Sequence, residues 1–174
     1  MVATGLFALI MTLVAGAYLV MIGLVHHTQG MSSGIDNLSF ALETMTRDIR
    51  TGTAYSCDTT PHYDCSGLGT FYFTPMGGQP GDYTYYSLDS DTNGNGMLEK
   101  TIKTANGTSI EPLTDSSTIN ITSLKFYLSG STPGDAYQPY VTIVVSGKIS
   151  SDEPDDPPQS FTVETSAVMR GTDL

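Results

Sequence analysis

The residues best suited to chemistry lie in a short acidic, glycine-rich stretch at 88–100, which reads LDSDTNGNGMLEK. Asp89, Asp91 and Asn93 alternate and Gly94 follows, as at the start of calcium loops, where oxygen side chains converge on the ion and a glycine permits a tight turn. The twelfth position is Lys100, where a helix–loop–helix calcium site has glutamate. Two interpretations stay open, a calcium site of another kind and a turn rich in Asp, Asn and Gly. The candidate calcium ligands are Asp89, Asp91, Asn93, Asn95 and Glu99.

The two cysteines, Cys57 and Cys65, lie close together in the polar part of the chain. An exported protein would oxidise such a pair to a disulfide, which closes a small loop and restricts the unfolded chain. His62 with Asp58 or Asp64 could instead complete a zinc site with the two thiolates, but the spacing matches no usual zinc signature. We therefore expect a disulfide, no required cofactor, and calcium as the one candidate ion.

Catalytic signatures are absent from the sequence. His26 and His27 border the apolar N-terminal segment, which leaves His62 as the one histidine in the polar part that could act as a general base. There is no nucleophile elbow, phosphate-binding loop or zinc-protease motif. The 7 Lys and Arg against 18 Asp and Glu give a net charge of −11, which disfavours binding of nucleic acid by a basic surface. We expect a protein without enzymatic activity.

The pattern of the first 52 residues predicts one long helix, and we expect the rest of the chain to be arranged around it. Residues 1–25 contain no charge and are long enough to cross a bilayer, which takes roughly 20 apolar residues. Over 26–52 apolar residues recur every three or four positions among polar ones, which predicts an amphipathic helix that ends at Gly52. A cleaved signal peptide is the alternative, but no basic residue precedes the apolar run. The residues expected to dock this half on a sheet are Met31, Ile35, Leu38, Leu42, Met45 and Ile49.

The rest of the chain, 53–174, has the pattern of a β domain. Strands are expected at 70–74, 83–88, 97–103, 121–128, 140–149 and 161–169. Because turns rather than helices separate them, they should form an antiparallel sheet, with 140–149 central. The stretch at 53–69 is expected to be a loop, and 150–160 a solvated connection stiffened by prolines. The predicted fold class is α+β, with the sheet packed on the second half of the long helix.

Several stretches resemble one protein family. The run MVATGLFALIMTLVAGAYLVMIG is similar to the N-terminal helix of type IV pilins and type II secretion pseudopilins, and LETMTRDIRTGTAY at 42–55 is similar to the end of that helix in minor subunits of the PilW and pseudopilin J kind. The hairpin at 83–103, the strand INITSLKFYL and the closing SFTVETSAVMRG also resemble that group. Family members carry a basic leader and a Phe-Thr-Leu-Ile-Glu-like segment before such a run. We therefore expect Met1 to be an internal methionine of a longer precursor.

The resemblance implies a structural subunit of a type IV pilus-like filament, a minor pilin or pseudopilin that initiates or caps assembly after prepilin-type N-terminal methylation. It implies a single-pass inner-membrane protein with an extracytoplasmic β domain, which later joins a periplasmic or extracellular filament. Its partners would be other pilin or pseudopilin subunits, bound through the helix. Two alternatives stay open: a major pilin of the shaft, and a membrane-anchored module whose acidic, tyrosine-rich loops bind a ligand. The expected filament-packing residues are Leu6, Phe7, Leu9, Ile10, Leu13, Val14, Leu19 and Ile22.

Overall fold

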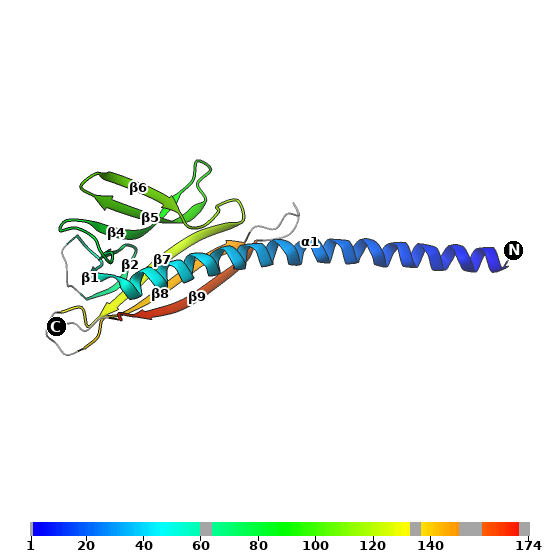
Figure 1. Ribbon diagram of the computed structural model, residues 1–174. Coiled ribbons are helices and arrows are strands. Elements are labelled where there is room, and N and C mark those ends of the chain that lie inside the picture. The colour runs from blue at the N-terminus through cyan, green and yellow to red at the C-terminus, as the bar shows by residue number, and fades with distance from the viewer. Residues whose placement is uncertain (1, 60–63, 133–136, 150–157, 171–174) are drawn as a thin grey trace.

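The computed structural model describes residues 2–59, 64–132, 137–149 and 158–170. It begins with one helix, α1 (Val2–Thr51). The first half of α1 projects from the rest of the molecule, and the second half lies along it (Figure 1). The last turn is closed by the Gly52 N–H, which donates to the carbonyls of Asp48 and Ile49, and by the Tyr55 hydroxyl, which donates to those of Ile49 and Gly52. These bonds satisfy carbonyl groups that a helix end leaves without partners.

Nine strands follow in the described part of the chain, and every pairing between them is antiparallel. They are β1 (Thr53–Ser56), β2 (Cys65–Leu68), β3 (Phe71–Thr74), β4 (Tyr83–Ser90), β5 (Gly96–Thr104), β6 (Gly107–Pro112), β7 (Ile119–Ser129), β8 (Tyr140–Ile149) and β9 (Gln159–Val168). One sheet has five strands in the order β1-β3-β4-β5-β6, and the other has four in the order β2-β7-β8-β9. The predicted α+β fold class is confirmed, and β8 is an interior strand as expected.

The structure differs from the sequence-based expectation in the number of sheets and in three short strands. The expected single sheet is two sheets, and the expected loop at 53–69 contains β1 and β2. Each of these strands has four residues and takes its hydrogen bonds from a longer partner, β3 or β7. Strand β6, also not predicted, is exposed throughout and has no apolar alternation. These three strands form because they pair with neighbouring strands in the fold, and their local sequence pattern alone does not predict them.

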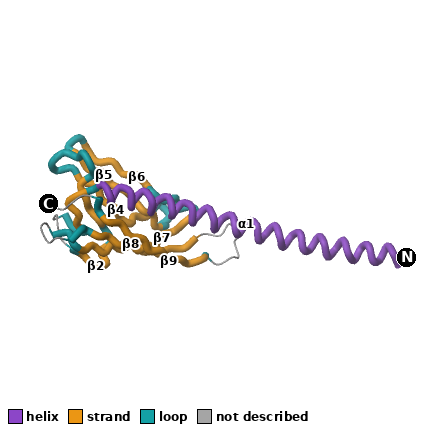
Figure 2. Tube along the Cα trace, turned by 60° about the horizontal axis from the view of Figure 1, so that its bottom comes forward, coloured by secondary structure: helices purple, strands orange, loops and turns teal. Residues whose placement is uncertain are grey.

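The second half of α1 packs on the inner face of the four-stranded sheet, as Figure 2 shows from a second direction. Of the expected docking residues, Leu38, Leu42, Met45 and Ile49 are buried, and Met31 packs partly buried against the core. Ile35 is 50% exposed although its neighbour Gly34 is buried close to Ile149, so the Ile35 side chain lies at the edge of the helix–sheet contact. The helix side chains share one core with residues of both sheets, among them Phe71, Leu98, Phe126, Ile143 and Val145.

Two further contacts hold the sheets together. The predicted disulfide between Cys57 and Cys65 is confirmed, and it joins the end of β1 to the start of β2, so that it links one sheet to the other. Strand β5 also lies directly against β7. The Gly96 N–H donates to Asn120 Oδ1 at 2.9 Å, and a Cβ at Gly96 would overlap the carbonyl oxygen of Ile121. The two sheets and the helix end therefore form one body.

Candidate functional site

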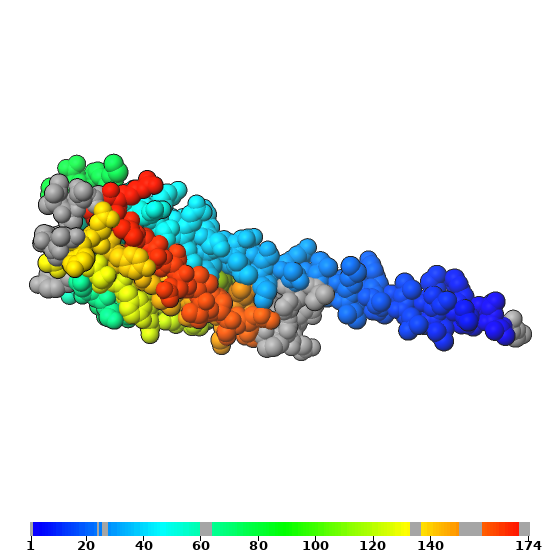
Figure 3. Space-filling model, turned by 90° about the horizontal axis from the view of Figure 1, so that it is seen from below, coloured from blue at the N-terminus to red at the C-terminus, as the bar shows by residue number. Residues whose placement is uncertain are grey.

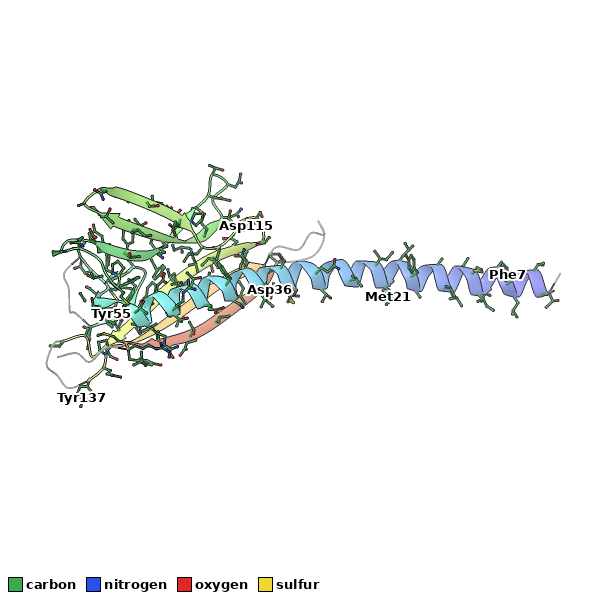
Figure 4. The ribbon with its side chains drawn as sticks, viewed as in Figure 1. Phe7, Met21, Asp36, Tyr55, Asp115 and Tyr137 are labelled. Atoms are coloured by element: carbon green, nitrogen blue, oxygen red, sulfur yellow. A yellow bond between two sulfur atoms is a disulfide. The ribbon has the colours of Figure 1, made fainter. Side chains whose placement is uncertain are left out.

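Most of the exposed large apolar side chains among the described residues lie on the projecting half of α1. The expected filament-packing residues in this half are all between 38% and 69% exposed. Figure 4 shows Phe7 and Met21 directed away from the bare helix at points well separated from both sheets. Figure 3 shows the same segment as a rod with no other part of the chain against it. A helix that is apolar on every side requires an apolar environment around it.

This helix is long and apolar enough to cross a membrane, and the window that passes this test has none of its residues buried. Charge is absent from the sequence until Asp36, which lies where the helix reaches the β domain (Figure 4). Just beyond it, Asn37 Oδ1 accepts a hydrogen bond from the Asp115 N–H at 3.2 Å. The first charged side chain of the helix therefore lies where the helix meets its own domain. The single-pass anchor expected from the sequence is consistent with this arrangement.

The candidate calcium loop forms the turn between β4 and β5, and its central carboxylate is already engaged. Asp91 Oδ1 accepts hydrogen bonds from the N–H groups of Asn93 and Asn95, both at 2.8 Å, and Oδ2 accepts one from the Ser116 hydroxyl at 2.8 Å. The Ser116 bond and then the backbone bonds lower the pKa of Asp91. These bonds, together with Gly94 at φ +83°, are those of a turn rich in Asp, Asn and Gly, which is the alternative to a calcium site that the sequence analysis left open.

The other two acidic candidates form a pair on the strands that flank the turn. Glu99 is 9% exposed, and burial and then the neighbouring Asp89 carboxylate raise its pKa. Asn93 and Asn95 come from the turn itself. The three carboxylates among the five candidate ligands are therefore divided between the turn, which holds Asp91, and the flanking strands, which hold Asp89 and Glu99. Within the described residues, no group of three or more His, Cys, Asp or Glu side chains is placed to hold a metal. Calcium binding by this loop stays a prediction.

The zinc alternative loses its sulfur ligands, because Cys57 and Cys65 are bonded to each other. His62 lies outside the described residues, as do the side chains of His26 and His27. The carboxylate of Asp64 has a structural role instead. It accepts hydrogen bonds from the Ser131 N–H at 2.9 Å and hydroxyl at 2.8 Å and from the Gly130 N–H at 3.2 Å. These bonds tie the segment before β2 to the segment after β7.

A tyrosine cluster covers part of the outer face of the five-stranded sheet. The rings of Tyr72, Tyr83 and Tyr85 have centroids 5.0 to 6.3 Å apart, and the Lys103 ammonium lies 5.3 Å from the centre of the Tyr83 ring. A hollow of about 240 Å³ opens beside them, with carboxylates on its rim. The alternation YTYYS places Tyr83 and Tyr85 on one face, so the sequence contains the signal for part of this cluster. The two carboxylates in the lining are Asp58 and Asp82.

Comparison of the chain with protein-family models, with curated proteins and with solved structures finds no match.

Proposed function

We propose that this chain is a structural, non-enzymatic subunit of a type IV pilus-like filament, a minor pilin or pseudopilin that initiates or caps assembly. The observation that carries the proposal is the division of α1 into two halves. One half is buried on the chain's own sheets, and the other leaves the domain with apolar side chains on every side. The family resemblance of the sequence supports the same function.

The projecting half cannot stay in water. Each large apolar side chain costs roughly 1.5–3 kcal/mol when it is exposed rather than buried, and this segment exposes more than ten of them. Lipid removes this cost before assembly, and neighbouring helices remove it afterwards. Transfer from lipid to a helix bundle then depends on how well the helices pack. Small residues such as Gly16 and Gly23 let a neighbouring helix come close. A Cβ built on either glycine would have no atom within 4 Å, so this surface is open.

The disulfide supports the proposed location of the β domain. Such bonds form and persist outside the reducing cytoplasm. In this proposal α1 crosses the inner membrane once with the β domain on the extracytoplasmic side, and assembly moves the subunit into a periplasmic or extracellular filament. The proposed partners are other pilin or pseudopilin subunits, which contact Leu6 through Ile22 along the helix.

Mass spectrometry of the native protein tests the proposal. The protein is recovered separately from membranes and from sheared surface filaments, and its N-terminal peptide and abundance are measured in each fraction. We expect an N-methylated N-terminus and a low copy number in the filament fraction. High abundance there would instead identify a major pilin of the shaft. An unmodified N-terminus in a protein found only in membranes would contradict the filament proposal.

The tyrosine cluster and its hollow favour one second candidate, a membrane-anchored extracytoplasmic module that binds a ligand. Tyr72 and Tyr83 supply ring faces, and Asp58 and Asp82 supply carboxylates to the same hollow. This candidate predicts a monomer that diffuses freely in the membrane, which single-particle tracking of the labelled protein would show. A filament subunit predicts clusters or static assemblies in the same measurement.

A further inference from the structure

Strand β6 forms one edge of the five-stranded sheet, and all of its residues are exposed. It pairs with β5 on one side, and no described strand pairs with its other side. Figure 1 shows it at the border of the molecule, with both neighbouring segments, 104–106 and 113–118, described in full. An edge strand offers unpaired N–H and C=O groups to any extended chain that comes beside it.

The pairing with β5 determines which backbone groups of β6 point outward. Opposite residues of an antiparallel pair alternate between those that exchange hydrogen bonds and those that do not. The Leu113 N–H donates to the Leu98 carbonyl at 2.8 Å, so these two residues form a bonded pair. Counting back along the register, Glu111 and Ser109 also bond to β5. The even-numbered residues of β6 therefore turn their backbone groups away from β5.

The open edge consists of the backbone groups of Thr108, Ile110 and Pro112. Thr108 and Ile110 each present an N–H and a C=O, and Pro112 presents only a C=O because proline has no N–H. Within the described residues, neither of the two N–H groups has a hydrogen-bond partner. The edge can therefore bond a short extended segment through its main chain.

The outer face beside this edge is apolar. Ile110 lies opposite Thr101 on β5, and Thr101 lies opposite Tyr85 of the tyrosine cluster on β4. Thr101 is buried between its neighbours, whereas Ile110 is 59% exposed. Side chains directly opposite each other on neighbouring strands stabilise a sheet when their types match. An apolar side chain on an added strand would cover Ile110.

The other face beside the edge is acidic. Glu111 lies opposite Lys100, but the Lys100 ammonium contacts Asp48 at 2.7 Å instead. Within the described residues, Glu111 forms no ion pair. The whole chain carries a net charge of −11, which adds to the attraction for a basic partner. The edge is thus complementary to a strand that places a basic side chain beside Glu111 and an apolar one beside Ile110.

Antiparallel pairing with the β6 of a second copy conflicts with the direction of α1. Such pairing relates the two copies by a two-fold axis perpendicular to the strands. Strand β6 runs lengthwise along α1, as Figures 1 and 2 show, so the same axis would point the two projecting halves in opposite directions. Two copies anchored in one membrane from the same side cannot adopt this arrangement. We therefore look to a segment of a different subunit.

We propose that β6 is a docking edge for an extended segment of another filament subunit, which adds a strand to the five-stranded sheet. The docked segment alternates apolar side chains, one of them beside Ile110, with basic side chains, one of them beside Glu111. The identity of the partner rests on the proposed filament function. Main-chain hydrogen bonds supply affinity in such a contact, and the alternating side chains supply specificity. The contact joins two β domains, whereas packing of the projecting helices joins the anchors.

Hydrogen exchange resolved to single residues tests the docked edge, with the full-length chain compared in detergent micelles and in sheared filaments. We expect the Thr108 and Ile110 amides to exchange at least about tenfold more slowly in filaments, because the added strand bonds them. The Ser109 and Glu111 amides bond to β5 and should be protected in both samples, so they are the control within the same strand. Equal exchange of Thr108 and Ile110 in both samples would overturn the proposal.

Photocross-linking in intact cells identifies the occupant. A photoreactive amino acid replaces Thr108, and mass spectrometry identifies the linked peptide. We expect a segment of another pilin or pseudopilin subunit in which basic and apolar residues alternate. A link to a second copy of this chain, a linked segment without that alternation, or no link at all would overturn the proposal. The expected link in cells that have no filament would contradict the filament function alone, and unprotected Thr108 and Ile110 amides within filaments would contradict the docking edge alone.

Two variants show whether the link depends on the edge. Ile110→Pro removes an outward N–H without removing a bond to β5, and proline is tolerated on edge strands, so the fold should be kept. Glu111→Lys reverses the charge that attracts the basic side chain. We expect each to reduce the link at least about tenfold. Ile110→Val, which keeps the N–H, and Glu164→Lys, on an exposed position of β9, are the matched controls and should leave it unchanged. A link that survives both test variants would overturn the proposal.

Discussion

At the scale of single residues, Glu99 on β5 and Asp89 on β4 place two carboxyl groups beside each other. Burial and the Asp89 carboxylate raise the pKa of Glu99, so the folded protein holds this proton more tightly than the unfolded chain does. The contribution of Glu99 to the free energy of unfolding is therefore fully present below its unfolded pKa, and it is lost as the pH rises through the folded pKa. Once Glu99 loses its proton, the charged form is disfavoured by burial and by the Asp89 carboxylate, which destabilises the hairpin.

Glu99→Gln should therefore stabilise the fold at neutral pH by about 1 kcal/mol, the size of one hydrogen bond, and should change little at pH 4. Denaturant unfolding of both proteins across this range measures the difference. The variant must be compared with the parent at each pH, because other groups also make stability depend on pH. Asp64, Asp91 and Asp115 have lowered pKa values, so their stabilising contributions are lost as the pH falls, in parent and variant alike. Glu164→Gln, on an exposed position of β9, is the control. A variant less stable than its parent at neutral pH would mean that Glu99 binds a cation or another partner.

A second residue-scale feature joins α1 to the five-stranded sheet. Asp48 Oδ2 accepts a hydrogen bond from the Lys100 ammonium at 2.7 Å and another from the Tyr86 hydroxyl at 3.0 Å. The Asp48 and Lys100 side chains are only 21% and 18% exposed. Burial and then the Asp48 charge raise the pKa of Tyr86 well above its usual range, so this hydroxyl stays a donor.

Lys100→Met should destabilise the fold by about 2 kcal/mol, because it leaves the partly buried carboxylate of Asp48 without its cation. Adding Asp48→Leu should recover part of this loss, since an apolar pair of similar volume replaces the ion pair. Unfolding midpoints of the parent, the two single variants and the double variant give the coupling energy. The exposed Lys125→Met is the control and should stay within about 0.5 kcal/mol of the parent. Strictly additive effects would show that the two charges act independently.

At the scale of elements, the contact of β5 with β7 depends on the absence of a side chain. Gly96→Ala should cost about 2 kcal/mol or more, because its Cβ would overlap the Ile121 carbonyl and force the sheets apart. Gly69→Ala is the matched control, since its Cβ would lie at an ordinary 3.6 Å from the Leu124 carbonyl. Chemical denaturation of the two variants compares them. Equal stability of both variants would contradict the close approach of the two strands.

The disulfide joins the same two sheets at their edge strands, β1 and β2. Replacing Cys57 and Cys65 by serine should lower stability by about 2–3 kcal/mol, the loop-closure cost for a bridge of eight-residue separation. Unfolding of the parent with and without a thiol reductant should show a loss of similar size. If the reduced parent and the serine variant unfold at the same denaturant concentration as the oxidised parent, the bridge does not stabilise the fold.

The sequence was sufficient for the elements with a strong local pattern. The long helix and the six expected strands, now β3, β4, β5, β7, β8 and β9, follow from apolar periodicity, and β8 was recognisable by the run at 141–145. The division into two sheets was not predictable, because it depends on where the short strands β1, β2 and β6 find partners. The Tyr55 hydroxyl that closes α1 was also missed, since a tyrosine three positions beyond a helix stop has no sequence signature as a cap.

The same distinction between local pattern and tertiary contact holds for the candidate sites. The exposed apolar half of α1 could be located from composition alone, because no charge interrupts it. The loop at 89–99 carries a calcium-like pattern, but only the structure shows that Asp91 is engaged by Ser116, 25 residues away in sequence. Arg170 lines one hollow with Arg47 and Arg50 across more than a hundred residues, so this grouping could not be found from spacing.

At the scale of the whole molecule, the two halves of α1 should respond to mutation independently. Met45, fully buried in the docked half, and Leu13, 65% exposed in the projecting half, form a matched pair on one helix. Met45→Ala should lower the stability of the β domain by about 2–5 kcal/mol through the cavity it leaves. Leu13→Lys should leave that stability unchanged and deplete the protein from membranes and filaments, because a lysine at the bilayer centre costs about 2.5–3.5 kcal/mol.

Tyrosine fluorescence separates the two effects without a label. Of the ten tyrosines only Tyr18 precedes residue 53, and the chain has no tryptophan, so the signal reports almost entirely on the β domain. Unfolding of both variants in detergent gives the stability change, and quantitative mass spectrometry of the membrane and filament fractions gives their distribution. If Leu13→Lys destabilised the β domain, the projecting half would fold together with it. The proposed anchor would then not be a separate packing surface held ready for other subunits.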